Sequence, residues 1–169
     1  QIPGKENKDM RLAEDYKIVP VGVPLDLNSA ATVDTDSINM KNFHRATFII
    51  GFETLATESA VLTAYSGATD GACTSQLYFK YAFGSAAAGS ANCDVLAAET
   101  LVNTLTITHG TYDNYMLIVE IEADRMDREN AEEWLTLRFT DPGGATGEVQ
   151  VFAILEPRYS KNLSITALA

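Results

Sequence analysis

Two glutamates in the stretch YMLIVEIEAD are the first residues whose spacing could support chemistry. Glu120 and Glu122 are separated by one residue, and an extended strand would place both carboxylates on one face, roughly 7 Å apart. Many glycosidases use paired carboxylates near that separation. The solvent-facing side of any amphipathic strand produces the same alternation. We prefer the second interpretation, in which both side chains are simply hydrated.

Acidic side chains also occur in the segment that follows this stretch. Asp124, Asp127 and Glu129 lie close together in sequence, and Asp141 falls in a later turn. Calcium favours several oxygen ligands on such loops. The spacing nevertheless matches no calcium-binding motif, so the preferred interpretation is a hydrated acidic loop without a metal.

The remaining reactive residues are few and scattered. His44 and His109 are the only histidines, and they lack the spacing of metal ligands. Cys73 and Cys93 each lie in a loop of small residues, and both a disulfide and two unpaired thiols stay open. No base is placed beside either cysteine, and no catalytic or phosphate-binding motif occurs. We therefore expect no cofactor and no enzymatic activity.

An aromatic stretch offers a different kind of site. Alternation in LYFKYAF puts Phe79, Tyr81 and Phe83 on one face, where they would stack on a carbohydrate or, more simply, face a core. A carbohydrate-binding module would need tyrosines accessible to solvent. The candidates are Tyr65, Tyr78, Tyr112 and Tyr115.

Short alternating segments dominate the chain and predict an all-β fold. Residues 115–124, 134–140 and 148–155 are predicted to form a β-meander, with the last strand buried on both faces because its second half is apolar throughout. Further strands are predicted at residues 43–52, 60–65, 77–83, 95–98 and 101–108. Turn residues separate these segments, and no long helix is predicted. The pattern favours a single antiparallel β-sandwich of jelly-roll type.

Both ends of the chain differ from the body in composition. Residues 1–27 are predicted to form an extended N-terminal arm, residues 28–159 the sandwich, and residues 160–169 a C-terminal extension. Pro20 and Pro24 remove backbone donors, so residues 17–27 suit an edge strand or an extended segment rather than a central strand. Removal of residues 1–27 is expected to leave a folded body.

Charge narrows the range of partners. The formal net charge is −11 over 169 residues. Nucleic-acid binding depends on lysine and arginine neutralising phosphates, and anionic membranes attract basic segments. No stretch of the sequence has the length of a transmembrane helix. We expect neither a nucleic-acid nor a membrane partner.

Three segments of the second half carry a resemblance to known proteins. They are IVEIEADRMD (118–127), WLTLRFTDPGGATGEVQVFAIL (134–155) and the closing EPRY (156–159), with SGATDGACTSQLYFKYAF (66–83) and TLTIT (104–108) fitting more loosely. These segments are similar to a group of small virion structural proteins of tailed bacteriophages, usually encoded near the capsid genes. The resemblance implies a capsid decoration (cement) protein on the outer capsid surface of the virion. It also implies binding to the major capsid protein and a homo-oligomer, in many cases a trimer.

We therefore predict a non-enzymatic capsid decoration protein that stabilises the shell. The proline-bearing segment is the predicted contact with the capsid or with another subunit, because it stays extended and its apolar residues can be buried. Its predicted contact residues are Ile18, Val19, Pro20, Val21, Val23, Pro24 and Leu25. A carbohydrate-binding or host-adhesion module and a tail or neck component of the virion are the alternatives.

Overall fold

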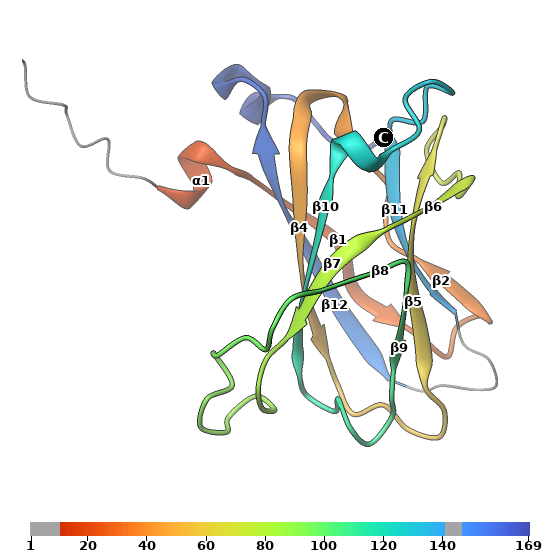
Figure 1. The fold of residues 1–169 in the computed structure, drawn as a ribbon, viewed down its shortest axis with the longest axis vertical. Coiled ribbons are helices and arrows are strands. Elements are labelled where there is room, and N and C mark those ends of the chain that lie inside the picture. The colour runs from red at the N-terminus through yellow and green to blue at the C-terminus, as the bar shows by residue number, and fades with distance from the viewer. Residues whose placement is uncertain (1–10, 141–146) are drawn as a thin grey trace, which may run out of the picture.

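A computed structural model describes residues 11–140 and 147–169, and it shows two antiparallel sheets packed face to face (Figure 1). The predicted antiparallel β-sandwich is confirmed. Sheet A has the order β1-β12-β4-β10-β7-β8, and sheet B has the order β2-β11-β5-β6, with β3 beside β11 and β9 beside β5. The acidic turn at Asp141 lies outside the described residues.

The strands and helical turns have the following bounds. Sheet A consists of β1 (Lys17–Asp26), β4 (Phe43–Phe52), β7 (Phe79–Phe83), β8 (Thr100–Val102), β10 (Met116–Glu122) and β12 (Glu148–Pro157). Sheet B consists of β2 (Thr32–Asp34), β3 (Ile38–Asn39), β5 (Ala60–Gly67), β6 (Ser75–Leu77), β9 (Thr104–Ile107) and β11 (Trp134–Thr140). The short α1 helix (Leu12–Asp15) precedes β1, and the 3₁₀ turns are η1 (Met40–Asn42), η2 (Ala123–Arg125) and η3 (Ser160–Ser164).

The core lies between the sheets and takes one side of each strand. Successive side chains of a strand point to opposite faces, so burial in β4 and β12 alternates along most of their length. Sheet A contributes Phe48, Ile50, Leu117, Val119, Val149 and Val151, and sheet B contributes Leu62, Leu137 and Phe139. Phe79 and Phe83 are buried and Tyr81 is half-buried against the core, which confirms the simpler interpretation of the aromatic stretch.

Consecutive strands mostly lie in different sheets, so the predicted β-meander is wrong. β10 and β12 belong to sheet A with β4 between them, whereas β11 belongs to sheet B. The predicted strand at 77–83 is split at Tyr78, with β6 in one sheet and β7 in the other. Residues 95–98 make only a single bridge, between Gly84 and Leu96. Polarity alternation predicts that a segment is extended, but contacts distant in sequence decide which strand it pairs with.

The N-terminal edge of sheet A is β1, so the edge-strand alternative for residues 17–27 is confirmed. β1 pairs with β12 from Lys17↔Leu155 to Asp26↔Glu148, with register irregularities around Gly22. Proline and irregular register are devices that protect an open sheet edge. Three side chains of this segment are buried in the sandwich: Val19, Val21 and Leu27. Removal of residues 1–27 would therefore take away part of the core, contrary to the expectation that a complete body remains.

The C-terminal ten residues pack against one end of the sandwich, where they are hydrogen-bonded to β3 and η1. The buried Asn162 donates from Nδ2 to the carbonyl of Asn42 at 3.0 Å. Ala167 is also buried, and its carbonyl accepts a hydrogen bond from the amide of Asn39 at 2.8 Å. This segment covers the end of the core instead of extending away from it.

Candidate interaction surface

The structure places the two candidate catalytic glutamates on one outward strand face, as predicted. Glu120 Oε1 accepts a hydrogen bond from Thr47 Oγ1 at 3.3 Å. Glu122 is exposed and lines an open depression together with His44 and Arg45. Both carboxylates therefore lie on the open outward side of sheet A.

The acidic loop uses its carboxylates within its own turns. Asp127 accepts hydrogen bonds from the backbone amide of Asn130 at 3.2 Å and from its Nδ2 at 2.7 Å. Asp124 pairs with Arg128 at 3.6 Å. Within residues 11–140 and 147–169, no three His, Cys, Asp or Glu side chains converge as metal ligands would.

The cysteines and tyrosines are also dispersed. Cys73 and Cys93 are both free and half-buried, so the alternative with two unpaired thiols is the observed one. Burial, followed by the charge of Asp34, raises the pKa of the Cys73 thiol.

Among the four candidate tyrosines, only Tyr78 is largely exposed. Tyr112 stacks on Phe83 with ring centroids 3.9 Å apart, whereas Tyr65 and Tyr115 are half-buried.

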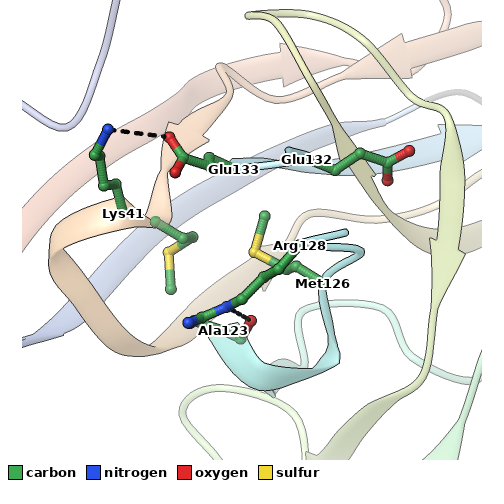
Figure 2. Close-up of a pocket in the computed structure, with 7 residues that line it drawn as sticks. Lys41, Ala123, Met126, Arg128, Glu132 and Glu133 are labelled. Carbon is green, nitrogen blue, oxygen red and sulfur yellow. Dashed lines mark hydrogen bonds and ion pairs between the residues drawn. The ribbon is translucent and has the colours of Figure 1, made fainter. Parts of the chain in front are cut away.

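A small pocket of about 100 Å³ lies at the end of the sandwich, between η1, η2 and the start of β11 (Figure 2). Its charged side chains are already engaged. Glu133 points to Lys41 at 3.8 Å, and Arg128 Nε donates to the carbonyl of Ala123 at 3.3 Å. Glu132 points the other way, where its buried carboxylate accepts hydrogen bonds from Ser66 at 2.5 Å and Ser75 at 3.1 Å. These contacts fix the loop before β11.

The outward side of sheet A carries a feature that the sequence analysis did not single out. Cross-strand pairing aligns five residues, one from each of five neighbouring strands, and we name them the apolar row. The row consists of Pro20, Phe152, Ile49, Ile118 and Ala82. Ile18 and Ile154 pair beside it on one side, and Met116 lies on the other. We call this whole surface the apolar face.

Much of the apolar face remains in contact with water. Phe152 is 36% exposed, Ile18 is 47% exposed and Leu101, on the outward side of β8, is 49% exposed. Ile49, Met116 and Ile118 are half-buried. The prediction that β12 is buried on both faces is therefore wrong, because its outward apolar side chains are not covered by the described part of the chain. An exposed apolar surface that spans several strands is typical of an interaction site.

A groove runs along the apolar face at Gly51. It has a volume of about 360 Å³ and is lined by Ile49, Gly51, Phe52, Ala88, Asn114, Tyr115, Met116, Gln150 and Phe152. Gly51 is exposed, and a Cβ atom added there would meet nothing within 4 Å. The amide of Ala88 donates to the carbonyl of Asn114 at 2.8 Å, which holds the loop after β7 against one side of the groove.

The outward side of sheet B is polar by comparison. Arg138 donates from Nε and Nη2 to the two carboxylate oxygens of Asp34, both at 2.7 Å. Its guanidinium lies 5.3 Å from the ring centroid of Tyr65, and the hydrogen bond to Asp34 raises the pKa of Arg138. The neighbouring outward positions are mostly threonines: Thr32, Thr63, Thr104, Thr106 and Thr140. The two outward faces therefore differ, and among the described residues only the face of sheet A presents a broad apolar surface.

No protein-family model matches this chain, and no curated protein matches it. None of the helices in the described part of the chain has the length and apolar composition needed to cross a lipid bilayer.

The predicted contact segment divides between the core and the apolar face. Val19 and Val21 are buried in the core of their own chain, and Leu25 packs against it. Ile18 and Pro20 point outward and extend the apolar face to the edge of the sheet. Pro24 is exposed, and the side chain of Val23 lies outside the described part of the structure. Only the outward residues remain candidates for contact with a partner.

Proposed function

We propose that this chain is a non-enzymatic virion structural protein, a capsid decoration protein that docks on the outer capsid surface through its apolar face. The observation that carries the proposal is the apolar row, in which Pro20, Phe152, Ile49 and Ile118 remain partly or largely exposed on four neighbouring strands of sheet A. Ala82, at the end of the row, is buried. Removal of such a surface from water stabilises a complex by roughly 25 cal/mol per Å² before the cost of association.

Charge supports a protein partner different from this chain. A net charge of −11 opposes self-association at neutral pH and disfavours binding to phosphates and anionic lipids. The similarity of residues 118–127 and 134–159 to phage virion proteins supports the capsid as that partner. A shell also repeats the same docking site many times, so modest contacts suffice when subunits bridge neighbouring sites. A trimer remains a prediction.

The test uses the full chain mixed with empty, undecorated shells. We expect the protein to co-sediment with the shells and to raise the temperature at which they break down. Ile118→Lys should abolish both effects, because it places a charge in the apolar row. The fold should survive this substitution, since the lysine stem can cover apolar surface while its ammonium group stays in water.

The matched control is Thr106→Lys, which adds the same charge to an exposed strand position on the polar face of sheet B. This variant should bind shells as the unchanged protein does. A protein that ignores shells but binds tails or glycans would refute the decoration proposal in favour of the alternatives.

A further inference from the structure

We infer that the groove at Gly51 receives an apolar side chain from a protein segment that carries lysine or arginine beside it. The inference rests on the proposed function, because it specifies the chemistry of the partner that docks on the apolar face. It combines the shape of the groove with an uncompensated row of carboxylates at one end.

The groove is suited to a single large side chain. Its volume of about 360 Å³ lies at the lower end of the range for ligand pockets. The absence of a side chain at Gly51 leaves the floor open, and Ile49, Met116 and Phe152 line it with apolar atoms. An aromatic or long aliphatic side chain is the group that gains most from such a site.

Three carboxylates occupy the next outward positions along the same strands. Asp26 pairs with Glu148 across β1 and β12, and the amide of Glu53 donates to the carbonyl of Glu148 at 3.0 Å, which places these residues in one cross-strand row. Like charges in directly opposite positions destabilise a sheet. Asp26 accepts a hydrogen bond from the amide of Asn28. Neither Glu53 nor Glu148 has an ion-pair or side-chain hydrogen-bond partner within residues 11–140 and 147–169.

The opposite end of the apolar face is electrically more balanced. Arg45 pairs with Glu156 at 3.0 Å, and Lys80 pairs with Glu99 at 3.5 Å. Glu120 and Glu122 also lie at that end, so two cations there face four carboxylates, whereas no described cation pairs with the three carboxylates beside the groove. A basic residue of the partner would relieve the repulsion there, so the folded monomer carries a cost that complex formation removes.

A second copy of the chain does not fit this chemistry. Two copies joined through the same face would each contribute the row of Asp26, Glu53 and Glu148, and neither copy offers free cations on this face among the described residues. The net charge of −11 per chain adds to that repulsion. The occupant is therefore a different, basic protein segment.

The experiment titrates the ¹⁵N-labelled full chain with two blocked peptides, Ac-Gly-Lys-Trp-Lys-Gly-NH₂ and Ac-Gly-Glu-Trp-Glu-Gly-NH₂. We expect the lysine peptide to shift the amide signals of Gly51, Met116 and Phe152, and to bind at least about tenfold more tightly than the glutamate peptide at low salt. Salt at 0.5 M should remove most of that difference, because exposed charges are screened.

Two variants and one control separate the effect of shape from the effect of charge. Gly51→Leu should fill the groove and abolish binding of the lysine peptide, whereas Thr106→Leu, the same residue added to the face of sheet B, should leave binding unchanged. The double variant Glu53→Gln and Glu148→Gln should retain binding but lose the preference for lysine. Unfolding curves of each variant verify that the fold is kept.

Two results would overturn the inference: equal binding of the two peptides, or full binding of the lysine peptide by Gly51→Leu. These results are distinguishable from failure of the proposed function. Shells that bind Gly51→Leu fully but not Ile118→Lys would leave docking intact and refute the groove. Peptides that behave as expected while the unchanged protein ignores shells would refute the decoration proposal alone.

Discussion

We predict that β1 is required for the sandwich to fold. We compare a chain that begins at Asn28 with one that begins at Lys17, so that the difference between them isolates residues 17–27. The shorter chain lacks β1 and exposes the edge of β12 along its whole pairing with that strand. It should be largely unfolded at 25 °C, whereas the longer chain should remain folded.

The expected magnitude follows from burial. Val19, Val21 and Leu27 are each at most 4% exposed, and full burial of such a side chain stabilises by roughly 1.5–3 kcal/mol. The three side chains together contribute about 5–9 kcal/mol. Backbone hydrogen bonds to β12 add about 0.5–1.5 kcal/mol each. The total is comparable with the whole stability of a typical domain, about 5–15 kcal/mol.

The assay is unfolding in urea, followed by circular dichroism and by the fluorescence of Trp134, the single tryptophan. The chain that begins at Lys17 should give one cooperative transition, and the shorter chain should give none or a midpoint near zero urea. A shorter chain whose free energy of unfolding stays within about 2 kcal/mol of the longer one would refute the reasoning. β1 would then be an accessory segment, as the sequence alone suggested.

Three further predictions concern the body of the sandwich. Glu132→Ala should lower the free energy of unfolding in urea by about 3–6 kcal/mol, because the hydroxyls of Ser66 and Ser75 lose a charged acceptor. Glu132→Gln should lower it clearly less. Equal losses would contradict the role of Glu132 as the hydrogen-bond acceptor of these two serines. Gly67→Ala should lower the melting temperature, since its Cβ would clash with the backbone carbonyl of Ala72. Gly51→Ala, where an added Cβ meets nothing within 4 Å, should change stability by less than about 0.5 kcal/mol. Asp34→Asn, in a Cys93→Ser background, should speed the alkylation of Cys73 by iodoacetamide at pH 8. The substitution removes a negative charge that raises the pKa of the Cys73 thiol, and it frees Arg138, whose positive charge lowers that pKa. An unchanged alkylation rate would show that Asp34 has no such effect.

Local pattern was sufficient to predict individual strands but not their neighbours. Residues 43–52 were predicted to form one strand, and β4 has those bounds. The position of β4 between β10 and β12 depends on contacts with segments more than 60 residues away in sequence, which periodicity does not encode. The same limit made consecutive segments resemble a meander, although the chain crosses between sheets.

The sequence pattern of the apolar face is a run of consecutive apolar residues, and such a run has two structural explanations. The run VFAIL in β12 shows apolar residues at consecutive positions, which predicts a strand buried on both sides, and the run MLIV in β10 has the same character. A strand with one buried face and one exposed apolar face gives the same run. Only the cross-strand register shows that Phe152, Ile49 and Ile118 form one continuous row. The groove could not be predicted from the sequence either, because the open space above Gly51 depends on a loop that is distant in sequence.

Hydroxyl-radical footprinting of the protein, free and bound to empty shells, tests the docking proposal most directly. Met116 and Phe152 report on the apolar face, and the half-buried Tyr65 reports on the outward face of sheet B. We predict that shells reduce the oxidation of Met116 and Phe152 severalfold and leave that of Tyr65 unchanged. Protection of Tyr65 with unchanged oxidation of Met116 and Phe152 would contradict docking through the apolar face.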